Sequence, residues 1–139
     1  MTDLELAKEQ LIKDECTCVL RKGDSMYCSH ARGVKPLLSL LDSGEDYRGY
    51  SAADKVVGKA AAMLYVLLGV SRVHACVISE KALAVLAKDG IDVTYDTLVD
   101  RIHNRTNTGF CPMEEAVWEI EDVQEGLQAV REKVAQLAK

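Results

Sequence analysis

The sequence predicts a single α/β domain over residues 1–139. Residues 73–78 form an apolar run and residues 91–95 alternate, both patterns of buried strands, and a helix-forming segment separates them. Strand, helix and strand in this order indicate a right-handed parallel crossover. Residues 60–68 are apolar on every side, as in a helix buried at the centre of a domain. A chain of 139 residues is long enough for one substantial core.

The first elements are a helix and a hairpin. Apolar positions 4, 6, 7, 11 and 12 predict a short amphipathic helix, and residues 16–20 have strand character. Lys22-Gly23-Asp24 then predicts a turn into a second strand over 25–30.

A three-residue turn would bring several metal-ligating side chains together. It makes Arg21 face Ser25, which puts Cys18 opposite Cys28 and Cys16 opposite His30 on one face. These four could bind zinc. Because Leu20 and Met26 share that face, the thiols could equally be buried as small apolar groups, and this second interpretation is preferred.

The middle of the chain contains the predicted central helix. Pro36 can open a short helix through residue 41, and a polar loop covers 42–49. Ser51 and Asp54 are spaced like a variant capping box, and Gly69 is placed as a stop, so the prediction is a helix over 52–68.

The last third predicts more helix. Ser79 can cap a helix that ends near Gly90, and Asp96 can cap a short helix before the polar loop 104–110. Pro112 is expected as the first residue of a long C-terminal helix from about residue 112. That helix has apolar residues at coiled-coil spacing, which favours a homodimer through it: Ala116, Ile120, Val123, Leu127, Val130, Val134 and Leu137.

Composition narrows the function classes. The net charge is −5 and the pI is about 5.2, with no basic stripe, so we expect no nucleic-acid partner. The acidic N-terminus is unlike a signal peptide and no apolar run has the length of a membrane span, so we expect a cytoplasmic protein that does not bind membranes. Its five cysteines are then expected to be reduced.

Two stretches resemble a known family. Residues 54–62, Asp-Lys-Val-Val-Gly-Lys-Ala-Ala-Ala, and Asn104-Arg105 followed by Cys111-Pro112-Met113-Glu114 are similar to signatures of the bacterial family named domain of unknown function 1893. The resemblance implies a three-layer fold similar to cytidine deaminases, a mixed sheet of about five strands with helices on both faces. It implies no activity.

Zinc deaminases carry His-x-Glu on the central helix and Pro-Cys-x-x-Cys at the next strand-helix junction. The corresponding residues here are Gly58-Lys59-Ala60-Ala61 and Ile78-Ser79-Glu80-Lys81-Ala82, and neither segment supplies a set of zinc ligands. Zinc-dependent deamination is therefore not expected, and the sequence predicts no metal and no cofactor.

The leading hypothesis is a non-catalytic domain that binds a small nucleotide-like or anionic ligand. The start of the predicted central helix could receive an anion through its free N–H groups and its lysines, and the resemblance places this helix end at the ligand pocket. Alternatively, Lys55 and Lys59 only form a solvated stripe. The candidate ligand-binding residues are Asp54, Lys55, Gly58, Lys59, Ser79, Glu80, Asn104 and Arg105.

Two other functions stay open. Cys111 precedes a helix start, which favours a thiolate, so Cys111 with Glu114, and with His103 as a base, could serve a cysteine-dependent enzyme or redox protein. A capping or packing role for Cys111 is the simpler alternative. The third function is a homo-oligomeric interaction module. His74, inside an apolar strand, is expected to be a core histidine with a hydrogen-bond partner.

Overall fold

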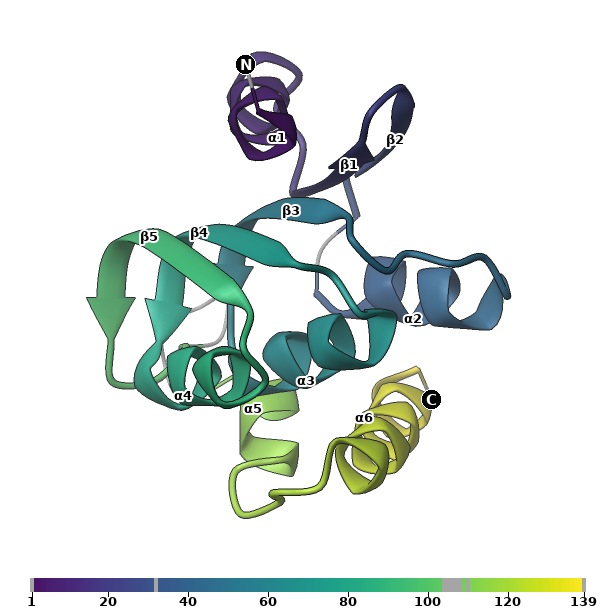
Figure 1. Cartoon of the computed structure of the whole chain (residues 1–139). Helices are drawn as coiled ribbons and strands as arrows, with labels where there is room; N and C mark the ends of the chain where they lie inside the picture. Colours follow the sequence, from purple (N-terminus) through teal and green to yellow (C-terminus); the bar gives the residue numbers. More distant parts are fainter. Residues whose placement is uncertain (1, 32, 104–108, 110, 139) are drawn as a thin grey trace.

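The computed structural model describes residues 2–31, 33–103, 109 and 111–138. Six helices and five strands follow one another within this part of the chain (Figure 1). They are α1 (Asp3–Lys13), β1 (Cys18–Lys22), β2 (Ser25–Ser29), α2 (Lys35–Asp42), β3 (Ser51–Val57), α3 (Lys59–Leu68), β4 (Arg72–Ser79), α4 (Glu80–Lys88), β5 (Asp92–Val99), α5 (Pro112–Ala116) and α6 (Val123–Leu137).

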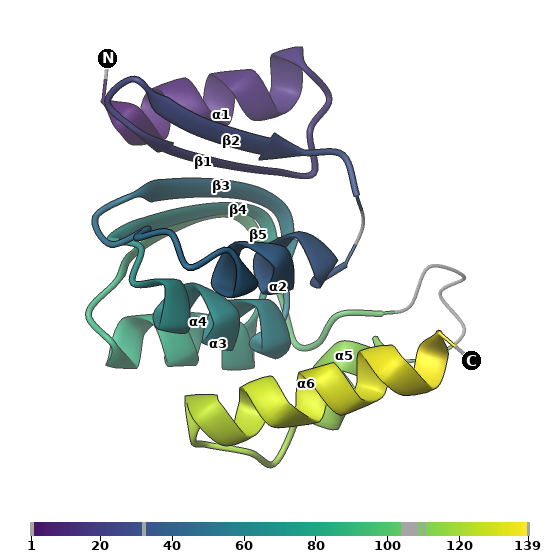
Figure 2. The same cartoon turned by 90° about the vertical axis from the view of Figure 1, so that its right-hand side faces the viewer.

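The strands form one mixed sheet in the order β2-β1-β3-β4-β5. β1 runs antiparallel to β2 and β3, whereas β3, β4 and β5 are parallel. Helix α1 lies on one face of the sheet, and the other helices lie on the opposite side, with α6 outermost (Figure 2). The predicted α/β fold, a mixed sheet of about five strands with helices on both faces, is confirmed.

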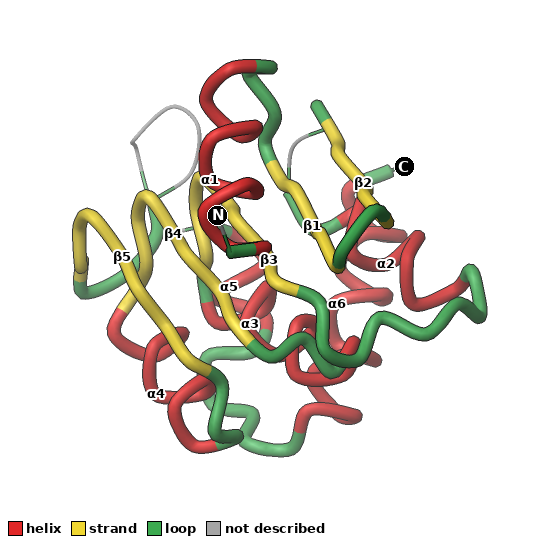
Figure 3. Tube along the Cα trace, turned by 45° about the horizontal axis from the view of Figure 1, so that its top comes forward, coloured by secondary structure: helices red, strands yellow, loops and turns green. Residues whose placement is uncertain are grey.

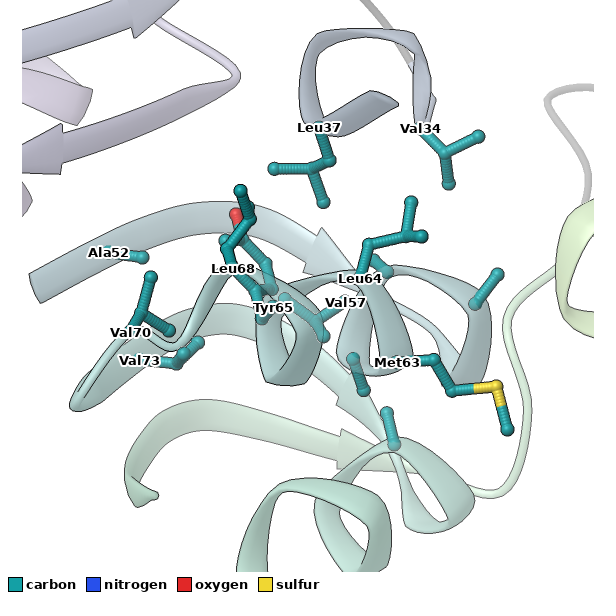
Figure 4. Packing of buried hydrophobic residues seen from close by; sticks show 14 of the residues in the cluster. Val34, Leu37, Ala52, Val57, Met63, Leu64, Tyr65, Leu68, Val70 and Val73 are labelled. Carbon is teal, nitrogen blue, oxygen red and sulfur yellow. The ribbon is translucent and has the colours of Figure 1, made fainter. Parts of the chain in front are cut away.

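Helix α3 is the buried centre of the domain. Eight of its ten residues are buried, because the sheet lies on one side of it and α6 packs on the other. Figure 4 shows Met63, Leu64, Tyr65 and Leu68 of α3 reaching into the surrounding core. Gly69 ends the helix in the left-handed region at φ 79°, as its position in the sequence predicted.

The predicted helix over 52–68 is wrong in its first half. Residues Ser51–Val57 form β3, the middle strand of the sheet, and the helix begins only after Gly58. Ala52 and Ala53 are fully buried, on opposite faces of the strand. These small residues let α1 and α3 approach the sheet from both sides, so tertiary packing overrides a local composition that favours helix.

The hairpin differs from the prediction by one residue. Lys22 pairs with Ser25, so only Gly23 and Asp24 form the turn, and Cys18 is opposite Ser29 instead of Cys28. A slip of one residue moves side chains to the other face of a strand. Cys18 therefore faces α3, whereas Cys16 and Cys28 face α1, and the predicted group of three cysteines and His30 does not form.

The crossover region follows the prediction more closely. Ser79 caps α4, with its Oγ accepting a hydrogen bond from the Ala82 N–H at 3.2 Å. β5 extends to Val99, so Asp96 lies inside a strand and the short helix predicted after it is wrong.

The C-terminal helix is divided in two. Pro112 opens α5 as predicted, but α5 ends at Ala116 and α6 begins at Val123 after an Asp122 cap. The apolar stripe of α6 packs against the core of its own chain, where Gly126 allows the closest approach to Met63. This stripe was the reason to expect a dimer through the helix; its last member, Leu137, is 58% exposed, and the dimer stays a prediction.

Among the described residues, no helix combines the length and apolar character needed to span a bilayer.

Candidate functional site

A buried carboxylate joins the starts of α3 and α4. Glu114, only 1% exposed, accepts a hydrogen bond from the Lys59 backbone N–H at 2.8 Å and another from the Ser79 hydroxyl, both at Oε2. Its Oε1 accepts one from the Ile102 N–H at 2.7 Å. Unpaired N–H groups and the helix dipole make a helix start an anion site, and here two helix starts share one anion. The anion is a side chain of the protein itself.

Gly58 makes this arrangement possible. A Cβ at Gly58 would lie 3.3 Å from Glu114 Oε2 and 3.2 Å from the Ile102 side chain, so a larger residue would press on the carboxylate. The sequence predicted an external anion at the α3 start. The Lys59 N–H and the Ser79 hydroxyl, which such an anion would have used, are bound by Glu114 instead.

Lys59 holds the segment between α5 and α6. The side chain is 2% exposed, its Nζ donates to the Trp118 carbonyl at 3.0 Å, and burial lowers its pKa. Lys81 Nζ donates to the same carbonyl at 2.9 Å, and its ammonium lies 4.0 Å from the centre of the Trp118 ring. The two lysines therefore help to fix the connection between α5 and α6.

A cavity of about 1050 Å³ opens beside the carboxyl end of β3. Its walls come from β3, from the starts of α2, α3 and α5, and from the end of α6. Of the residues predicted from the sequence, this cavity is lined by Asp54, Lys55, Gly58, Cys111 and Glu114. Lys59, Ser79 and Glu80 lie outside it, and Asn104 and Arg105 fall outside the described residues.

Asp54 is the polar centre of the cavity wall. Its Oδ2 accepts a hydrogen bond from the Tyr65 hydroxyl at 2.6 Å, and its Oδ1 accepts one from the Val56 N–H at 3.2 Å. The Cys18 sulfur lies 3.2 Å from the same tyrosine hydroxyl. Burial raises the pKa of Asp54 to about 6, even though the bond from Tyr65 acts in the opposite direction. Asp54 therefore changes charge close to neutral pH.

Sequence reasoning found Asp54 for the wrong reason and missed Tyr65. Asp54 was selected as part of a helix cap, yet it lies on a strand. Tyr65 is fully buried, and burial raises its pKa well above the usual value. The available signal was a phenol inside an apolar helix, because a buried tyrosine hydroxyl usually has a hydrogen-bond partner.

Cys111 lines the same cavity, but the Glu114 carboxylate is bonded to other groups and not to the Cys111 thiol. The half-buried cysteine precedes a helix of five residues, and its side chain makes no capping hydrogen bond. Its backbone N–H donates to the Ile102 carbonyl at 2.8 Å. His103 also lines the cavity, whereas the Glu114 carboxylate is bound to Lys59, Ser79 and Ile102.

Comparison with known proteins places the chain in a family. The model of the family described as "Domain of unknown function (DUF1893)" matches residues 6–134. The crystal structure of a DUF1893 family protein from Thermotoga maritima is similar, with a TM-score of 0.88 at 28% identity over 96% of this chain and 91% of that chain. No curated protein matches.

A more distant match is a diaminohydroxyphosphoribosylaminopyrimidine deaminase/5-amino-6-(5-phosphoribosylamino)uracil reductase from Thermotoga maritima. It has a TM-score of 0.44 at 15% identity and covers 67% of this chain and 35% of that chain. Similarity at this level carries no argument about activity. The family match covers most of the chain, so this protein belongs to the DUF1893 family.

Proposed function

We propose that this domain binds a small nucleotide-like ligand in the cavity beside β3. The observation that carries the proposal is Asp54, a half-buried residue in the wall of a cavity of about 1050 Å³, whose carboxylate is held by Tyr65. Ligand pockets of roughly 300–1000 Å³ are typical for small molecules, and most have apolar walls with a few polar groups.

The chemistry of the wall favours a ligand with two different ends. Val34, Leu37 and Met113 offer an apolar surface for a flat ring. An ionised Asp54 accepts hydrogen bonds from the amino or ring N–H groups of a heterocycle. Lys35, exposed where it lines the cavity, can pair with a phosphate. The Lys55 side chain follows Asp54 on β3 and therefore points to the α1 face, where it acts electrostatically on Cys16 and Cys76. A nucleoside monophosphate combines these features, whereas inorganic phosphate uses Lys35 alone.

The proposal moves the binding site away from the helix starts. Lys59 and Ser79 support the cavity from behind by holding Trp118 and Glu114, and they do not touch the ligand. Cysteine chemistry at Cys111 receives no comparable support, because Glu114 is committed to three other partners.

Isothermal titration calorimetry tests the proposal with cytidine 5′-monophosphate, adenosine 5′-monophosphate and inorganic phosphate as titrants. We expect at least one nucleotide to bind with a stoichiometry of one and more tightly than phosphate. Asp54→Asn and Lys35→Gln should each weaken that binding at least tenfold, since one lost charged hydrogen bond is about 1.5 kcal/mol or more. Lys88→Gln is the matched control, because Lys88 is exposed and does not line the cavity.

The pH dependence adds a second readout. Because the pKa of Asp54 is about 6 and the ionised form accepts the hydrogen bonds, nucleotide affinity should rise between pH 5 and pH 7. If neither nucleotide binds, or if Asp54→Asn and Lys35→Gln bind like the unmodified protein, the proposal is wrong.

A further inference from the structure

A second group of polar side chains lies on the face of the sheet that carries α1. His74 and Cys76 are two residues apart on β4, and Thr94 and Asp96 are two residues apart on β5. The register pairs His74 with Thr94 directly. Because alternate residues of a strand share a face, all four side chains stand on one side of the sheet. None of them lines the cavity at the carboxyl end of β3.

We propose that His74, Cys76 and Asp96 form a binding site for a zinc-class divalent metal ion. One ring nitrogen, the thiol sulfur and one carboxylate oxygen all lie within 4.8 Å of one another, and His74 Nε2 is 3.6 Å from Asp96 Oδ2. Ligands at zinc bond lengths of about 2.0–2.3 Å around a tetrahedral ion lie about 3.5 Å apart. The His74–Asp96 pair already has that spacing, and the exposed Asp96 side chain is free to rotate toward the thiol.

Thr94 orients the imidazole for this role. His74 Nδ1 and the Thr94 hydroxyl are 2.7 Å apart, which is a short hydrogen bond. It turns Nε2 toward Asp96, so the ring nitrogen left for a metal faces the other two ligands. Metal-binding histidines usually have such a partner on the second ring nitrogen. A core histidine was expected from the sequence; His74 is indeed 4% exposed and hydrogen-bonded, but its second nitrogen faces a thiol and a carboxylate.

The ligand set indicates the class of ion. A thiolate with an imidazole suits zinc and its substitutes such as cobalt, whereas magnesium and calcium prefer oxygen ligands alone. Binding displaces the Cys76 thiol proton to solvent, so the site contributes one thiolate, one neutral imidazole and one carboxylate. Three protein ligands leave a fourth position for water or another donor.

The surroundings leave that fourth position accessible. On this face of the sheet, helix α1 crosses above β1 and β3 and leaves β5 uncovered (Figure 3). Asp96 is 66% exposed, while His74 is buried beneath the edge of α1. The ammonium of Lys8, on α1, interacts electrostatically with both His74 and Cys76 and opposes a second positive charge.

Cobalt titration of the full chain tests the proposal. The protein is treated with a chelator, dialysed, kept reduced and titrated with CoCl₂ while its absorption spectrum is recorded. We expect one Co²⁺ per chain, a thiolate-to-cobalt charge-transfer band and the visible bands of a four-coordinate ion. Zn²⁺ should displace the cobalt and abolish these bands.

Variants distinguish this site from the other thiols. Cys76→Ser should remove the charge-transfer band, and Cys28→Ser should leave it, although Cys28 is also half-buried on the α1 face. Asp96→Asn changes an exposed residue, so it should fold normally and bind Co²⁺ at least tenfold more weakly. Thr94→Val should weaken binding about 10–100-fold, as for other partners of a metal-bound histidine. Lys8→Gln should strengthen it.

Two results would overturn the assignment. One is that the unmodified protein shows no thiolate-to-cobalt charge-transfer band after one equivalent of Co²⁺ has been added. The other is a band that persists in Cys76→Ser and disappears in Cys28→Ser, which would assign the ion to Cys16 and Cys28. Circular dichroism of each variant confirms that a lost band does not reflect unfolding.

Discussion

Replacing Glu114 with glutamine should destabilise the domain by about 3 kcal/mol. The carboxylate accepts three hydrogen bonds, from the Lys59 N–H, the Ser79 hydroxyl and the Ile102 N–H. A glutamine oxygen can accept two of them at the Oε2 position. Its NH₂ group then lies against the Ile102 N–H, so two hydrogen-bond donors face each other at the place where the Ile102 N–H had donated to Oε1.

The magnitude follows from three contributions. Loss of one hydrogen bond to a charged group costs about 1.5–3 kcal/mol. Loss of the negative charge at two helix starts costs about 0.3–1 kcal/mol at each. Part of this loss of stability is offset, because the variant no longer has to desolvate a buried charge. The net loss of about 3 kcal/mol corresponds to a fall in Tm of roughly 10 °C for a domain of this size.

Urea unfolding followed by the fluorescence of the single tryptophan, Trp118, measures the change. Glu115→Gln is the control, because Glu115 is the next residue in α5 and is exposed. It should change the free energy of unfolding by less than about 0.5 kcal/mol, as surface substitutions usually do. If Glu114→Gln matches Glu115→Gln, the carboxylate does not hold the two helix starts together and the account of this site is refuted.

Three further predictions concern the core around α3. In the folded chain the pKa of Asp54 is raised from 3.8 to about 6, so the folded state binds its proton more tightly; the resulting stability is complete below pH 4 and is lost as the pH rises through 6. Asp54→Asn should therefore gain stability relative to the unmodified protein between pH 4 and pH 7, by about 1–3 kcal/mol. Denaturant unfolding of both proteins across this range measures the difference, and a difference that does not change with pH would contradict the prediction. Tyr65→Phe removes the hydroxyl that bonds Asp54, so the pKa of Asp54 should rise further in an NMR titration, and an unchanged pKa would exclude the bond. Gly126→Ala should lower stability by about 1–2 kcal/mol, despite the better helix propensity of alanine, because its methyl group would overlap the Met63 sulfur. In a Met63→Ala background the same change should become neutral or stabilising. An equal loss of stability in both backgrounds would rule out the contact with Met63 as its cause.

Local sequence patterns predicted the parts of the fold that local interactions determine. The α1 helix, the short helix after Pro36, the Ser79 cap and the Gly69 stop all appear as expected, because each depends on neighbouring residues. The strand at Ser51–Val57 could not be predicted in this way. Its alanines favour a helix locally, and only its position at the centre of the sheet makes small residues advantageous there.

The candidate site shows the same limit. The sequence identified Asp54, Lys55 and Glu114 as polar residues of interest, and all three line the cavity. It could not show that Glu114 binds the helix starts 55 and 35 residues earlier in the chain. Because that contact is long-range, an anion site predicted from a helix start was already filled by the protein itself.

The position of Glu114 and α6 late in the chain has a consequence for biosynthesis. All five strands precede α5, so the sheet emerges from the ribosome before α5 and α6 do. At roughly 5–20 residues per second, the segment from the end of β5 to the end of α6 needs about 2–8 s. During those seconds the apolar outer side of α3 lacks its cover, and the starts of α3 and α4 lack their carboxylate. The nascent chain would be most exposed to chaperone capture or to aggregation in this interval, and the docking of α6 would end it.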